Sequence, residues 1–117
     1  MTQEEILSTM RTDPEKGMST VTCLYTALVY KVVWGKLASV CTSEDIEETV
    51  SDVFLEFYRK HDSVDLSKGS LATFLITLAQ RRAVDVFRSI KPFLFEFVTF
   101  PFFIVIDIDA PSSVLAK

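Results

Sequence analysis

The sequence is poor in the residue types from which catalytic and metal sites are usually built. Its 117 residues include one histidine, two cysteines and three glycines. Cys23 and Cys41 form no Cys-x-x-Cys pair, so the common zinc and redox motifs are absent, and we interpret both as small buried core residues. Because His61 stands alone and no nucleophile, base and orienting group come together, we expect no enzyme, no metal site and no cofactor.

Secretory and membrane signals are also missing. The first residues, MTQEEILSTMRTDPEK, carry acids where a signal peptide needs bases. No run reaches the roughly 20 apolar residues that span a bilayer, because Glu96 and Pro101 interrupt the most apolar stretch, at 93–108. We therefore expect a cytoplasmic protein without membrane contact. Its length and its 49% of hydrophobic residues are typical of a single globular domain.

What the sequence does hold is an uneven distribution of charge. The net charge is only -4. Residues 43–56 contain six acids and no base, whereas residues 57–91 contain seven bases and three acids. The chain therefore carries two adjacent segments of opposite charge, which predict two different kinds of partner.

The apolar periodicity predicts a mostly helical chain up to Lys91. Asp13 followed by Pro14 is typical of a helix start, and the apolar steps of three and four residues predict one or two helices over 14–40. Three aromatic residues of this stretch are expected to help fill the core: Tyr25, Tyr30 and Trp34.

The acidic segment predicts an amphipathic helix. We expect Ser43 as its N-cap, with Glu47 completing the capping arrangement. The expected buried stripe comprises Ile46, Val50, Val53, Phe54 and Phe57. The opposite face comprises Glu44, Glu48, Ser51, Asp52 and Leu55. This face is either a docking site for a basic partner or a solvated helix surface.

Residues 61–70, HDSVDLSKGS, predict a loop, and Ser70 is placed to cap a further helix over 71–90. The core stripe expected for that helix comprises Leu71, Leu75, Leu78, Ala79, Val86 and Ile90. Another face gathers Thr73, Thr77, Gln80, Arg81, Val84, Arg88 and Lys91. Its hydroxyls, amide and positive charges suit phosphate oxygens and exposed bases, although a solvated basic helix has the same composition.

In this order the segments resemble conserved region two of bacterial RNA polymerase sigma factors, particularly the small extracytoplasmic-function type. The likeness covers about 13–91 and rests on SEDIEETVSDVFLEFYRK and VDLSKGSLATFLITLAQRRAVDVFR. The family joins an acidic helix that ends in aromatic residues to an Asp-x-x-x-Gly-Ser loop and a helix containing Ala-x-x-Arg-Ala-x-Asp. The resemblance implies an all-α fold, a small helical bundle of the sigma region-two type over residues 1–91.

The resemblance also implies two partners in transcription initiation. The acidic helix would dock on the clamp helices of the largest subunit of core RNA polymerase, at Asp45, Glu48, Asp52 and Leu55. The loop and last helix would face promoter DNA at the minus-ten element, where the loop holds a flipped base. By match, the DNA-binding residues are Lys68, Gly69, Ser70, Arg81, Arg82, Arg88 and Lys91. An anti-sigma factor is a further candidate partner.

The chain departs from the family pattern at two of these surfaces. Ser51 stands where many relatives have Gln, and Arg81 stands where many have Asn, so a promoter sequence is not carried over. Arg82 and Asp85 have two interpretations: a structural ion pair or a contact with DNA. We consider the ion pair at least as well supported as the contact.

The segment 92–117 has no counterpart in region two. We expect no region-four domain, the helix-turn-helix domain that reads the minus-thirty-five element in complete factors. The hydrophobic stretch 93–108 predicts one or two strands broken at Pro101. Three alternatives stay open for the segment 92–117: packing on the helices to close a core, pairing in a homodimer, or the foreign end of a truncated or frameshifted gene. If the segment folded over the basic face from Arg81 to Lys91, we would expect it to inhibit DNA binding.

Two alternatives to an initiating factor also stay open. One is a truncated or regulatory sigma-like protein that binds polymerase or another protein without initiating alone. The other is a protein-interaction module without DNA binding, which would be indifferent to promoter strands at any salt concentration.

Overall fold

The computed structural model describes residues 1–90, 111–112 and 115–116. Its helices are α1 (Gln3–Thr12), α2 (Pro14–Leu37), α3 (Ser43–Lys60) and α4 (Leu71–Ile90), with a 3-10 turn, η1 (His61–Ser63), after α3. Two very short strands, β1 (Pro111–Ser112) and β2 (Leu115–Ala116), pair in parallel. The expected all-α bundle is confirmed, and the strands predicted within 93–108 lie outside the described residues.

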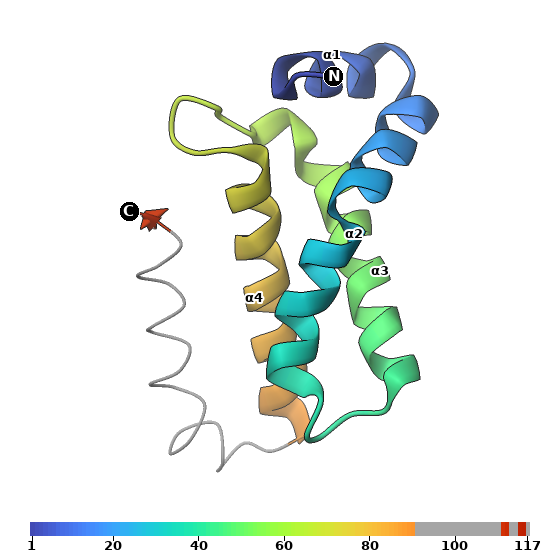
Figure 1. Cartoon of the computed structure of the whole chain (residues 1–117), viewed down its shortest axis with the longest axis vertical. Helices are drawn as coiled ribbons and strands as arrows, with labels where there is room; N and C mark the ends of the chain where they lie inside the picture. The colour runs from blue at the N-terminus through green and yellow to red at the C-terminus, as the bar shows by residue number, and fades with distance from the viewer. Residues whose placement is uncertain (91–110, 113–114, 117) are drawn as a thin grey trace.

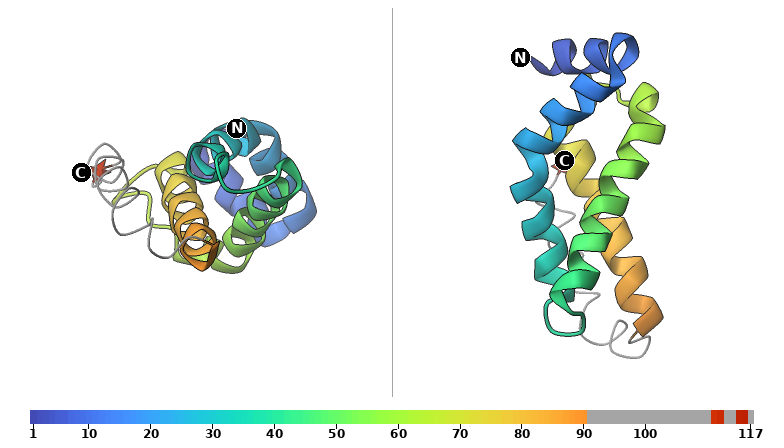
Figure 2. Two further views of the ribbon diagram at one scale, coloured as in Figure 1. Left: turned by 90° about the horizontal axis from the view of Figure 1, so that it is seen from below. Right: turned by 90° about the vertical axis from the view of Figure 1, so that its right-hand side faces the viewer.

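Helices α2, α3 and α4 pack against one another along their lengths, and α1 crosses one end of this bundle (Figures 1 and 2). α3 runs antiparallel to both α2 and α4. The loop between α3 and α4 therefore lies at the same end as α1, whereas the α2–α3 connection lies at the other end. None of the helices in the described part is long and apolar enough to cross a membrane.

Side-chain caps fix where the helices begin. Asp13 caps α2 by accepting the Lys16 N–H at 3.3 Å, with Pro14 as the first helical residue, as predicted. The N-cap of α3 is Thr42, so the prediction of Ser43 is wrong by one residue. Thr42 has extended backbone angles, φ -77° and ψ 166°, and its capping box is completed by Asp45 instead of Glu47.

The core forms mainly between α2, α3 and α4. All five residues of the stripe predicted for α3 are buried. From α2 the core takes Val21, Val29, Val33 and Leu37. Trp34 is 53% exposed, so its predicted core position is wrong: it directly follows Val33 and points about 100° away around the helix. Tyr25 and Tyr30 are partly buried against the core.

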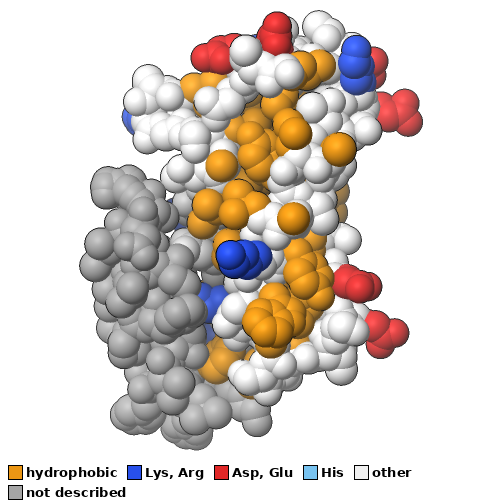
Figure 3. All heavy atoms as spheres, viewed as in Figure 1, with side chains coloured by type: hydrophobic (Ala, Val, Ile, Leu, Met, Phe, Trp, Pro, Cys, Tyr) orange, Lys and Arg blue, Asp and Glu red, His pale blue; other side chains and the backbone are white. Residues whose placement is uncertain are grey.

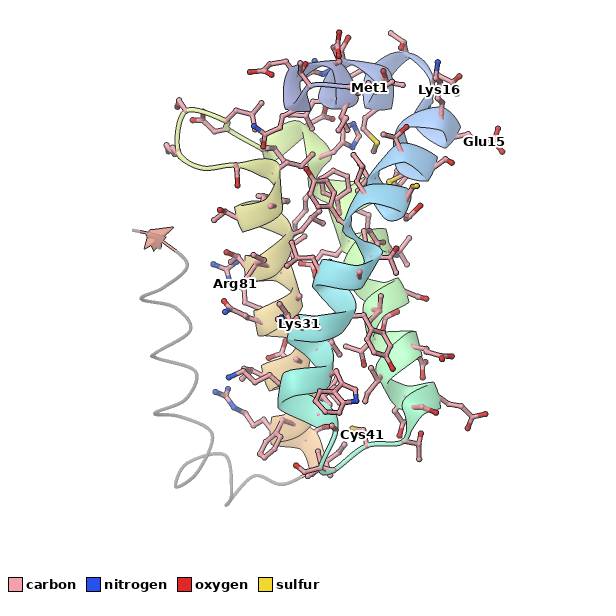
Figure 4. The ribbon with its side chains drawn as sticks, in the orientation of Figure 1. Met1, Glu15, Lys16, Lys31, Cys41 and Arg81 are labelled. Atoms are coloured by element: carbon pink, nitrogen blue, oxygen red, sulfur yellow. The ribbon has the colours of Figure 1, made fainter. Side chains whose placement is uncertain are left out.

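The two cysteines are not the buried core residues that we expected. Cys23 is exposed on α2, two positions after Val21 and so on another side of the helix. Cys41 is half-buried in the α2–α3 connection (Figure 4), where burial and the nearby Asp45 carboxylate raise the pKa of its thiol. Cys41 is therefore held in the protonated form at neutral pH.

The buried side of α4 turns around the helix along its length. Leu71, Leu75, Leu78 and Ala79 are buried as predicted. Val86 is only half-buried and Ile90 is 41% exposed, whereas Gln80 and Val84, predicted on the outer face, are buried. A single straight stripe does not describe α4, because it packs against both α2 and α3.

Candidate functional site

The residues predicted to bind a protein partner form one stripe on α3. Asp45, Glu48, Asp52 and Leu55 follow one another at steps of three, four and three residues, so they share a helix face. Glu48 is exposed and Leu55 is 47% exposed, while Asp52 is half-buried. In Figure 3, acidic side chains project from the flank of the molecule that α3 forms. An apolar residue among acids suits a basic partner that also buries apolar area.

Two details of this stripe were not predicted. The Asp45 carboxylate also accepts the backbone N–H of Thr42 at 3.3 Å, so it holds the helix start as well as facing solvent. Tyr58 extends the stripe by three residues beyond Leu55 and is 43% exposed. Its spacing from Leu55 was the signal available in the sequence. Tyrosine is enriched among the residues that contribute most to the affinity of protein interfaces.

Glu56 belongs to the acidic segment but serves a contact between helices. Its carboxylate accepts the Lys60 ammonium N–H at 2.8 Å and lies 3.5 Å from the Arg82 guanidinium. The hydrogen bond from Lys60 lowers the pKa of Glu56, with smaller contributions from both positive charges. The ion pair of Arg82 seen in the described part is thus with Glu56, and the pair predicted with Asp85 is wrong.

Four of the predicted DNA-binding residues line one pocket. It has a volume of about 270 Å³ and lies between the loop and the first half of α4. The four are Lys68, Gly69, Ser70 and Arg81. Figure 4 shows Arg81 on the outer side of α4, on the flank opposite α3. The pocket therefore opens on a different side of the bundle from the acidic stripe.

The lining of this pocket combines an aromatic wall with hydroxyl groups. Phe74 supplies the aromatic surface, and its ring is held edge-on by the buried Phe57, with centroids 6.1 Å apart. Ser70, Thr73 and Thr77 add hydroxyl groups along α4. A flat, polar-edged aromatic ligand suits such a pocket, and Lys68 and Arg81 at its margin suit an attached phosphate.

Local hydrogen bonds hold the loop in shape. The Asp65 carboxylate accepts the backbone N–H of Ser67 at 3.0 Å and its hydroxyl at 2.6 Å, and these bonds lower the pKa of Asp65. The Ser70 hydroxyl accepts the N–H of Thr73 at 3.0 Å, which confirms the predicted cap of α4. A methyl group added at Gly69 would make only ordinary contact with Thr73, at 3.7 Å, so packing does not require glycine there.

Two of the remaining predicted DNA-binding residues, Arg82 and Arg88, do not line the pocket. Arg82 is half-buried and paired with Glu56, and Arg88 is exposed in the last turn of α4. Lys91 lies outside the described residues. Gln80, counted on the same face, is 1% exposed. Within the described part, no group of three or more His, Cys, Asp or Glu residues is arranged to hold a metal ion.

The match to a known family runs from within α2 to the end of α4. The model of the family described as Sigma-70 region 2 matches residues 24–92. The chain belongs to this family. The match contains the acidic stripe, the loop and the pocket, and α1 precedes it.

Curated relatives of this region-2 chain are sigma factors of the extracytoplasmic-function class. "ECF RNA polymerase sigma factor SigK" of Mycolicibacterium vanbaalenii is 51% identical over 43 residues, which are 37% of this chain and 22% of the relative. The protein of the same name from Mycobacterium ulcerans is 40% identical over 58 residues, 49% of this chain and 31% of the relative. The matches thus span less than a third of these relatives. No solved structure matches the chain.

Proposed function

We propose that this chain acts in transcription initiation by binding core RNA polymerase through α3 and single-stranded minus-ten promoter DNA through the pocket. The family supports this role, and the relatives are named as RNA polymerase sigma factors. The observation that carries the proposal is the pocket, which brings together Lys68, Gly69, Ser70 and Arg81 from two elements.

In this proposal a base leaves the stack as the duplex opens and enters the pocket. Its face packs on Phe74, and its polar edge meets the hydroxyls of Ser70, Thr73 and Thr77. Lys68 and Arg81 contact the flanking phosphates. Unstacking one base costs a few kcal/mol, which these contacts offset.

The acidic stripe has a separate task, which is to attach the protein to polymerase. Glu48 and Asp52 attract the basic clamp helices and set the orientation of approach. Leu55 and Tyr58 provide apolar area that is buried when the partner docks. Because Arg82 is paired with Glu56, we assign Arg82 to the contact between α3 and α4 in preference to a contact with DNA.

The DNA-binding part is tested with a fluorescently labelled single strand that carries a minus-ten sequence, titrated with the full chain at several salt concentrations. Lys68→Ala and Arg81→Ala are each expected to weaken binding about tenfold. Each should also make the plot of log affinity against log salt concentration shallower, by about 0.7 for every phosphate that is no longer neutralised. The matched control is Lys16→Ala, which removes an equal charge from an exposed residue at the start of α2, away from the pocket (Figure 4).

Equal losses of affinity in all three variants would mean that net charge alone attracts the strand. Wild-type protein that binds no single strand at low salt would contradict the DNA-binding part of the proposal.

A further inference from the structure

Helix α1 precedes the region matched by the family, yet it touches η1, whose Ser63 lines the pocket. It crosses the end of the bundle at which the loop lies and contacts η1 (Figures 1 and 2). Its buried residues Ile6, Leu7 and Met10 anchor it on the core. A capping box between Thr2 and Glu5 fixes its start. Gln3, the first residue of α1, is therefore held in a defined place.

Gln3 makes a hydrogen bond across the fold to the start of α4. Its side-chain oxygen accepts the backbone N–H of Leu71, which is 68 residues away. Leu71 is the first residue of α4, where N–H groups lack a partner within the helix. Leu71 is also 0% exposed, so in the folded chain its N–H is shielded from water while it donates to Gln3.

The junction that Gln3 holds is part of the pocket. Ser70, the residue before Leu71, lines the pocket and caps α4. On the other side of the loop a shallow groove faces α1, lined there by Glu4, Leu7 and Arg11. Val64 and Asp65 line both the groove and the pocket. This stretch of loop therefore separates the pocket from the groove that α1 lines.

We propose that Gln3 is a positioning residue for the pocket. By holding the Leu71 N–H, it fixes the Ser70–Leu71 junction and keeps the pocket in its binding shape before a ligand enters. Binding then requires less ordering of the loop, which strengthens it without any contact between Gln3 and the ligand. The link to DNA rests on the function proposed above, whereas the effect on the loop does not.

The test uses two substitutions of opposite effect in the full chain. Gln3→Met keeps the size of the side chain and removes the acceptor. Gln3→Glu keeps an acceptor oxygen and places a negative charge at a helix N-terminus, where it is favourable. Thr9→Val is the matched control, because it removes a side-chain hydrogen bond that stays within α1, from Thr9 to the Glu5 carbonyl at 2.8 Å. Circular dichroism checks that each variant is folded.

The first readout is amide hydrogen exchange at Leu71, which does not depend on DNA. Exchange is expected to be about tenfold faster in Gln3→Met and unchanged in Gln3→Glu and Thr9→Val. Should Gln3→Met fail to fold, Gln3→Asn replaces it, since the shorter amide does not reach Leu71. Equal protection of Leu71 in wild type and in the folded loss variant would overturn the inference.

The second readout is binding of the labelled minus-ten single strand. Gln3→Met is expected to bind about fivefold more weakly, with binding restored in Gln3→Glu and capture of core polymerase unchanged. If the wild type and Gln3→Met bind the strand with equal affinity, the positioning role of Gln3 is overturned, whereas the proposed function is not. Wild type that binds no strand would contradict the proposed function, and the exchange at Leu71 would then decide the role of Gln3 at the loop separately.

Discussion

At the scale of single residues, Glu56 shows that the position of an acidic residue on its helix decides whether it faces solvent or pairs with a neighbouring helix. It lies in the acidic segment, but it is within reach of Lys60 one turn later and of Arg82 on α4. The sequence alone suggests a pair between Arg82 and Asp85, because they are three positions apart on one helix. The contact with Glu56 depends on how α3 packs against α4, which spacing along the chain does not reveal.

The lowered pKa of Glu56 predicts a pH dependence of stability. A carboxylate with a lowered pKa in the folded state stabilises the fold above its ordinary pKa of about 4.5, and this contribution is lost as the pH falls through the lowered value. Glu56→Gln is therefore expected to reduce the free energy of unfolding by less than about 1 kcal/mol at neutral pH, because the site is partly exposed, and to have no effect in strong acid. Urea unfolding at both pH values measures the difference, and an equal loss of stability in acid would contradict the ionic origin.

At the scale of elements, α3 could be predicted closely and α2 and α4 only in part. The acids and apolar residues of α3 separate cleanly, so its predicted buried stripe, from Ile46 to Phe57, is confirmed. α2 is apolar around much of its circumference, which is why the prediction wrongly placed Trp34 inside. In α4 the buried side turns along the helix, so Gln80 and Val84 were misplaced. The role of α1 depends on a contact over 68 residues that no local pattern signals.

The packing of α3 on α4 depends on Phe57, which is 0% exposed and holds the ring of Phe74 edge-on. Phe57→Ala is expected to lower the free energy of unfolding by about 3–5 kcal/mol, because it removes buried apolar area and leaves a cavity. The neighbouring Tyr58→Ala, at an exposed position, is expected to cost less than about 1 kcal/mol. Chemical denaturation of both variants measures the two values, and a similar cost at both positions would contradict the described orientation of α3.

At the scale of the whole molecule, the two candidate surfaces lie on different sides of one small bundle. The acidic stripe lies on α3, and the pocket lies between the loop and α4. The chain reverses direction between α3 and α4, so the stripe and the pocket lie on different sides of the bundle although adjacent segments of the sequence supply them. The proposed function predicts that the protein uses this separation to hold polymerase and a DNA strand at the same time, and this is its central claim.

The most direct test of this claim is the formation of a ternary complex of core RNA polymerase, the full chain and a labelled minus-ten single strand, detected by native gel. We predict that the wild-type chain joins strand and polymerase. Glu48→Lys with Asp52→Lys should lose polymerase and keep DNA binding, while Glu15→Lys with Glu47→Lys, an equal change of charge off the stripe, should keep both. A chain that binds each partner alone but never both, or a stripe variant that still captures polymerase as well as wild type, would contradict the account.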